Sequence, residues 1–219
     1  MKTVVFDIGN VLLRWDPRHL YRSLFDDERE MEWFLATVCD AAWNLEQDRG
    51  RPWREAVETR IAAYPQWERH IRAYDERWHE TVAGPIDGSV AVLAALKAAG
   101  VPVYAISNFS AAKYDETARR FPFLDAFDGV VISGREGLVK PDPRIFRLFL
   151  ERYRLDAGDC VFIDDSEANA RAAQAIGMAA VHFRDGLDLA AALAALGVAA
   201  PALRRLPPPE PDAPARVTA

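Results

Sequence analysis

The chain alternates between short apolar segments and longer amphipathic ones, a pattern that indicates strands and helices in turn. The short segments are rich in β-branched and aromatic residues, which favours strands buried on both faces of a parallel sheet. We expect these strands at residues 3–7, 102–106, 129–133, 160–164 and 179–183. Helices are expected between and after the later strands, at residues 89–99, 111–121, 142–153, 167–176 and 187–196. This order predicts an α/β fold with a doubly wound parallel sheet.

Residues 17–81 differ from this pattern, because they are polar, charged and aromatic and contain no convincing strand. Helices are expected here, at residues 17–25, 28–48 with a break, 52–62 and 66–80. The block separates the first strand from the rest of the sheet, so it must leave the core and return to it. We therefore expect an all-helical cap at residues 15–83, inserted into a core made of residues 1–14 and 84–200.

Polar residues follow three of the expected strands directly. Asp7 follows the first strand, Ser107-Asn108 the second and Asp164-Asp165 a later one. Parallel strands end at the same edge of the sheet, where open α/β folds bind their ligands. The sequence therefore predicts that these five side chains meet at one site.

Each of these groups has a simple structural explanation beside its chemical one. A carboxylate such as Asp7 can attack phosphorus or carbon, but Asp in Asp-Ile-Gly-Asn can also form a turn. Asp164-Asp165 repel each other unless a cation offsets them, and Mg²⁺ accepts such carboxylates, although an acid there could also cap a helix. Lys140 can supply positive charge to a phosphate and to Asp7.

The composition of the chain excludes some classes of function. The chain has 219 residues, a net charge of −6 and a pI near 5.3, which argues against general nucleic-acid binding. It shows no signal peptide or apolar run of membrane length, so we expect a cytoplasmic protein. We also expect a monomer or homodimer. Residues 201–219 are rich in proline and are expected to form a disordered tail.

At this point the sequence resembles a known family. FDIGNV at residues 6–11, Ser107-Asn108, Lys140-Pro141 and DDS at residues 164–166 resemble the four ordered motifs of the haloacid dehalogenase (HAD) superfamily. The resemblance spans residues 3 to about 183 and includes the position of the helical cap. It implies a Rossmann-like core and a hydrolase, with a phosphatase favoured.

The resemblance also implies roles for individual residues. Asp7 would be the nucleophile, with Lys140 assisting it, and Mg²⁺ would be held by Asp7, the Gly9 carbonyl, Asp164 and Asp165. Asn169 matches a position that often supports such a metal site. The residues that would contact the substrate or its phosphate are Asn10, Arg49, Ser107, Asn108 and Lys140.

One departure from the family pattern concerns the general acid–base group. Phosphatases of this family usually carry a second aspartate two residues after the nucleophile, where this chain has Gly9. Losing such a group costs roughly 10²–10⁴ in rate. Glu46 or Asp48 of the cap could replace it, while Arg49 or Arg51 could reach an anionic substrate. Trp15 and Trp43 could line the pocket, although tryptophans in a helical bundle more often form its core.

Three functions are compatible with these residues. The first is a Mg²⁺-dependent phosphatase that hydrolyses a small phosphorylated metabolite, such as a sugar phosphate, through an aspartyl-phosphate on Asp7. The second is a metal-independent 2-haloacid dehalogenase. The absence of the second aspartate favours this alternative, because such enzymes lack it as well. The third is a catalytically weak binding or regulatory protein that retains the fold.

Overall fold

The computed structural model describes residues 2–206, and a five-stranded parallel sheet forms its centre. The strands are β1 (Thr3–Phe6), β4 (Val103–Ser107), β5 (Gly129–Ile132), β6 (Cys160–Asp164) and β7 (Ala179–His182). Their order across the sheet is β5-β4-β1-β6-β7, with every neighbouring pair parallel. The first strand thus lies in the middle, between the two that carry the other polar groups. The prediction of a doubly wound parallel sheet is confirmed.

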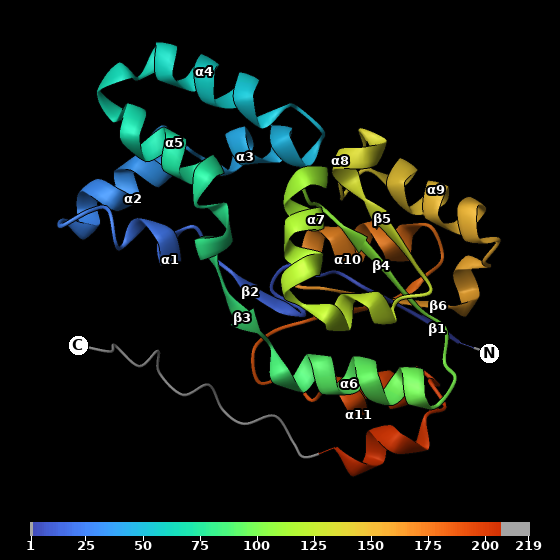
Figure 1. Ribbon diagram of the computed structural model, residues 1–219. Helices are drawn as coiled ribbons and strands as arrows, with labels where there is room; N and C mark the ends of the chain where they lie inside the picture. Colours follow the sequence, from blue (N-terminus) through green and yellow to red (C-terminus); the bar gives the residue numbers. More distant parts are fainter. Residues whose placement is uncertain (1, 207–219) are drawn as a thin grey trace.

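Helices cover both faces of this sheet (Figure 1). On one face lie α6 (Asp87–Ala98) and α11 (Leu189–Ala195), and on the other α9 (Pro143–Tyr153) and α10 (Glu167–Ala175). Alternate residues of β1 serve the two cores, because Val4 and Phe6 pack on the first side and Val5 on the second. Apolar burial on both faces explains why the strands are continuous apolar runs.

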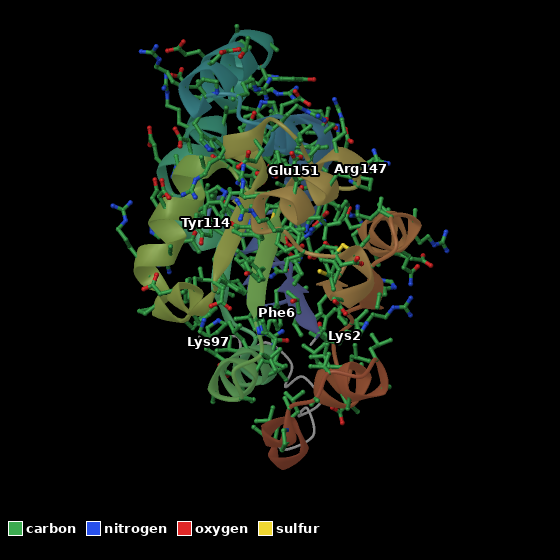
Figure 2. The ribbon with its side chains drawn as sticks, turned by 90° about the vertical axis from the view of Figure 1, so that its right-hand side faces the viewer. Lys2, Phe6, Lys97, Tyr114, Arg147 and Glu151 are labelled. Carbon is green, nitrogen blue, oxygen red and sulfur yellow. The ribbon has the colours of Figure 1, made fainter. Side chains whose placement is uncertain are left out.

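The helix α9 illustrates how the sequence sets these elements. Asp142 accepts a hydrogen bond from the Arg144 backbone N–H at 2.9 Å, which caps the helix start. Phe146 and Phe149 are buried against the sheet, whereas Arg147 and Glu151 lie on the opposite, solvent-facing side of the helix (Figure 2).

A two-stranded antiparallel ribbon, β2 (Leu13–Trp15) and β3 (Val82–Pro85), connects the core to the helical block. The sequence pattern did not indicate this ribbon, because each strand is short. We call residues 16–81 the cap. Its helices form a separate layer (Figure 1): α1 (Arg18–Tyr21), α2 (Glu28–Thr37), α3 (Ala41–Asp48), α4 (Trp53–Ala63), η1 (Pro65–Trp67), α5 (Glu68–Glu76) and η2 (Trp78–Thr81). The expected break within residues 28–48 falls between α2 and α3, whereas the helix expected at 17–25 ends at Tyr21.

Aromatic side chains form the interior of the cap. Trp43 is 4% exposed, and its ring lies 5.9 Å from that of Trp53 and 5.4 Å from that of Tyr74. Tyr21 in turn contacts the rings of Phe34 and Tyr74. Trp43 is therefore a core residue of the cap, as the more common role of tryptophan in a bundle indicates.

The remaining elements are short. α7 (Ala111–Arg120) follows β4, η3 (Pro122–Ala126) precedes β5, α8 (Ser133–Glu136) follows β5 and η4 (Ala157–Asp159) precedes β6. The 3₁₀ helix η5 (Pro201–Arg205) buries Leu203 beside α6 and α11. The ordered chain thus continues past residue 200, contrary to the boundary expected for the tail, and residues 207–219 lie outside the described part. No helix within the described residues has the length and apolar character needed to cross a bilayer.

Candidate active site

The predicted strand-end residues meet at one edge of the sheet. Asp7 follows β1, Ser107 ends β4 and Asp164 ends β6, and these three strands are neighbours in the sheet. Lys140, from the loop before α9, reaches the same point and is 2% exposed. Strand order therefore places three polar side chains together within the core, and the loop before α9 adds the fourth.

The carboxylate of Asp7 is oriented by one of its two oxygens. Oδ1 accepts hydrogen bonds from the Ile8 backbone N–H at 2.7 Å and from Ser107 Oγ at 2.6 Å. Lys140 Nζ lies 2.9 Å from the same oxygen. Within residues 2–206, Asp7 Oδ2 accepts no protein hydrogen bond. Oδ1 is thus fixed by three contacts, whereas Oδ2 has no hydrogen-bond donor among the described residues.

The Lys140 ammonium group contacts the carboxylates of both Asp7 and Asp164. Its Nζ lies 2.6 Å from Asp164 Oδ2 and donates to the Ile106 carbonyl at 3.0 Å, in addition to its contact with Asp7. Buried charge-assisted hydrogen bonds of this kind fix geometry strongly, because neither partner can exchange to water.

Asn108 has a different place from the one expected for it. Its side-chain amide donates to the Lys140 carbonyl at 3.0 Å and accepts from the Lys140 N–H at 2.7 Å. The side chain therefore positions the lysine loop, while the residue still lines the pocket. The phosphate contact expected from Asn108 stays a prediction.

Three carboxylates form the acidic part of the site. Ligand oxygens of Asp7, Asp164 and Asp165 all lie within 4.8 Å of one another. Asp164 is fully buried, and its oxygens accept from the Ser166 N–H at 2.8 Å and from Asn169 Nδ2 at 3.0 and 3.2 Å. Asp165 is exposed toward the pocket and does not cap α10. A pair of adjacent acids thus combines one rigid carboxylate and one accessible carboxylate.

When all three carboxylates at this edge are ionised, their charge exceeds that of Lys140. Burial raises the pKa of Asp7 to about 7, with Lys140 lowering it and Asp164 raising it. Burial and the neighbouring Asp164 also raise the pKa of Asp165. Hard oxygen ligands with excess negative charge are the donor set that Mg²⁺ prefers. The residues present therefore fit a magnesium ion, with Gly9 at the same pocket wall.

Asn10 links the site to the cap ribbon. It adopts a left-handed backbone conformation (φ 52°), and its Oδ1 accepts from the Trp15 N–H at 3.0 Å. A hydrogen bond from Asn10 also lowers the pKa of Asp165. Its position is at the pocket, and its contacts within the protein are to β2 and to the accessible acid.

A pocket of about 270 Å³ opens between these residues and the cap. Besides the polar residues at the strand ends and on α3, the pocket is lined by the apolar side chains of Leu13, Trp15, Leu45, Trp78, Val82 and Phe109. Of these, only Trp15 was a sequence candidate. Phe109 could have been found because it directly follows the strand-end pair, whereas Trp78 and Val82 depend on how the cap folds back.

Arg49 and Asp48, both sequence candidates, lie in different surroundings. Arg49 is exposed, pairs with Glu46 at 3.4 Å and does not line the pocket. Asp48 does line it, together with Asn44 one helical turn earlier. Arg49 thus lies outside the pocket lining, and the substrate contact expected from it stays a prediction.

Comparisons with known proteins agree with this architecture. A solved structure of the HAD family enzyme bt-2542 from Bacteroides thetaiotaomicron has a TM-score of 0.71 and 22% identity, covering 88% of this chain and 98% of that one. Another structure of the same enzyme, a complex with magnesium and inorganic phosphate, has a TM-score of 0.68. These likenesses concern the fold.

Among the relatives that match by sequence are two phosphatases. The sesquiterpene phosphatase astK of Aspergillus oryzae is 27% identical over 186 residues, covering 85% of this chain and 91% of the relative. The glyceraldehyde 3-phosphate phosphatase of Pyrococcus abyssi is 30% identical over 102 residues, covering 46% and 43%. The family model for haloacid dehalogenase-like hydrolases matches residues 1–177. The chain therefore belongs to the haloacid dehalogenase-like hydrolase family, as the order of its four motifs predicts.

Proposed function

We propose that this protein is a Mg²⁺-dependent phosphatase that acts through an aspartyl-phosphate on Asp7. The observation that carries the proposal is the orientation of that carboxylate. One oxygen is held by Ser107 and Lys140, and the other is unengaged within residues 2–206 beside the pair Asp164-Asp165. A haloacid dehalogenase does not need this paired acidic site, which favours phosphoryl transfer.

The residues divide the work as follows. Asp7 attacks phosphorus, so that its P–O bond forms while the bond to the leaving alcohol breaks. Water then attacks the aspartyl-phosphate, releasing phosphate and restoring the carboxylate. Lys140 lowers the pKa of Asp7, which favours the ionised nucleophile, and holds Asp7 Oδ1 in position. Asp164 and Asp165, with Asp7 and the Gly9 carbonyl, would hold Mg²⁺, which supplies positive charge against the transferring phosphoryl group.

The apolar pocket wall points to a substrate whose alcohol part is itself mainly apolar. Sugar hydroxyls that lay against Leu45, Trp78 and Phe109 would lose their hydrogen bonds to water, and such loss is costly. The relative from Aspergillus oryzae, which this chain matches over most of both lengths, is named a sesquiterpene phosphatase. We therefore favour a terpenyl or other long-chain alkyl phosphate over the sugar phosphate.

A substrate panel tests this function. We expect the highest kcat/KM on terpenyl or long-chain alkyl phosphates, lower values on glucose 1-phosphate, and loss of both after EDTA treatment. Halide release from 2-chloropropionate without metal would identify a dehalogenase instead. Stable binding of BeF₃⁻ without turnover of any phosphate ester would identify a regulatory protein.

Magnesium binding is expected to depend on pH through Asp7. Its pKa is raised to about 7 by burial, and the ion binds the ionised carboxylate. Below pH 7 binding must displace a proton, so affinity should rise about tenfold per pH unit and level off above it. Calorimetric titration at pH values on both sides of 7 measures this slope. In the variant Asp7→Asn the Mg²⁺ affinity should depend less on pH. A wild-type affinity that does not change with pH would contradict the assignment.

A further inference from the structure

The position that carries the second aspartate in related phosphatases is sterically open in this chain. A Cβ built on Gly9 meets no atom within 4 Å, and Gly9 is not among the residues with a positive φ. The absence of a side chain there is therefore not a packing requirement. It leaves free space in the pocket beside Asp7, and the leaving alcohol must receive its proton from another residue.

Asp48 is the acid that the cap presents to this space. It ends α3 and lines the same pocket as Asp7, Gly9 and Lys140. Its Oδ1 accepts from the Ser110 N–H at 3.0 Å, and its Oδ2 accepts from Asn44 Nδ2 at 3.0 Å. The carboxyl group is thus fixed between the cap and the start of α7.

The backbone around Asp48 is held against the core as well. Its carbonyl accepts a hydrogen bond from Ser133 Oγ, and a Cβ on Gly50 would lie 3.1 Å from the Gly134 carbonyl. Trp53 Nε1 donates to Ser110 Oγ at 2.8 Å on the other side of the turn. These contacts fix the position of Asp48 relative to both the cap and the core. A catalytic group must be held in position in this way.

The surroundings of Asp48 suit a group that both gives and takes a proton. Burial raises its pKa to about 7; the facing Asp7 adds to this rise, whereas Lys140 and the Ser110 N–H oppose it. Asn44 Oδ1 is buried and has no partner within residues 2–206. The Asn44 amide can donate to the carboxylate as it stands, and after a half-turn its Oδ1 could accept from the carboxylic acid.

We propose that Asp48 is the general acid–base of this enzyme, taking from the cap the role that Gly9 cannot perform. This inference rests on the proposed function. Asp48 donates its proton to the leaving alcohol oxygen as the P–O bond to that alcohol breaks. It then takes a proton from the water that attacks the aspartyl-phosphate, so the group returns to its starting state.

The substitution Asp48→Asn tests this role, because the amide oxygen can still accept from the Ser110 N–H. We expect kcat/KM on an alkyl phosphate to fall by about 10²–10⁴. On p-nitrophenyl phosphate, whose leaving group needs little protonation, formation of the aspartyl-phosphate should change less than about tenfold. Single-turnover release of p-nitrophenol and trapped phosphoenzyme separate the two steps. Glu58→Gln, which changes an exposed acid on helix α4 of the cap, is the control and should alter the rate on neither substrate.

Moving the acid back to its usual position provides the decisive measurement. Gly9→Asp in the Asp48→Asn background should recover at least about tenfold on the alkyl phosphate, whereas Gly9→Ala should recover nothing. If Asp48→Asn lowered the rate equally on both substrates and Gly9→Asp restored neither, Asp48 would only hold the cap against the core. No loss at all would remove it from the reaction. An inactive wild type would overturn the proposed function itself, a result distinct from an active wild type with an unchanged Asp48→Asn variant.

Discussion

The variant Asp7→Asn is expected to lose turnover of every phosphate ester, by about 10⁴–10⁶ in kcat, which is typical of removing a nucleophile. An amide at this position cannot form the acyl-phosphate. It can still accept from the Ile8 N–H and from Ser107, so the loop after β1 should keep its geometry. Steady-state rates measure the loss, and acid quenching followed by mass analysis should detect a phosphoryl group on wild-type Asp7 alone.

A matched control separates this effect from general loss of an acid. Asp128→Asn removes a carboxylate whose side chain is 36% exposed and paired with Lys97 at the surface. Its activity should equal that of the wild type. If Asp7→Asn retained substantial activity that EDTA does not remove, the attack by Asp7 would be refuted.

Removing Lys140 should produce the largest change in stability. In Lys140→Met, the buried carboxylates of Asp7 and Asp164 lose the ammonium group that lies 2.9 and 2.6 Å from them. Breaking a buried ion pair in this way costs about 3–5 kcal/mol. Urea unfolding of the metal-free protein measures the cost, and activity should fall as well because Asp7 loses its positive partner.

The pH dependence of this loss has a definite sign. The pKa of Asp7 is already raised to about 7 by burial, and removing Lys140 raises it further. The folded variant therefore binds protons more tightly than the unfolded chain, so its stability falls as pH rises. The gap to the wild type should be widest above pH 7 and narrower in acid. Lys97→Met breaks the exposed pair with Asp128 and should cost no more than about 1 kcal/mol at any pH. Equal losses in the two variants would contradict the burial argument.

Many features of the core could be predicted from the sequence, because they depend on local pattern. Strands such as residues 160–164 are apolar on both faces, and a parallel sheet is the architecture that buries both. Once the strands are parallel, Asp7, Ser107 and Asp164 must share an edge. The membership in the HAD-like hydrolases follows from the order of four short motifs and is confirmed by the family model.

The direction of individual side chains could not be predicted in this way. Asn108 is expected from the sequence to contact a phosphate, and its amide hydrogen-bonds to the backbone of Lys140, a partner thirty-two residues away. Arg49 and Asp48 are adjacent in sequence and point to different surroundings, since only one of them faces the pocket where α3 ends. Such choices depend on which atoms the folded chain brings opposite each residue.

The sequence by itself determined the sheet, the inserted helical block and the set of acids at the strand ends, since hydrophobic periodicity and strand direction are properties of local segments. Only the tertiary structure decided how that block closes over the acids. The ribbon of β2 and β3 and the contacts of Asp48 with Ser110 and Ser133 join residues far apart in the chain. The pocket wall and the cap carboxylate facing Asp7 exist only after those long-range contacts form.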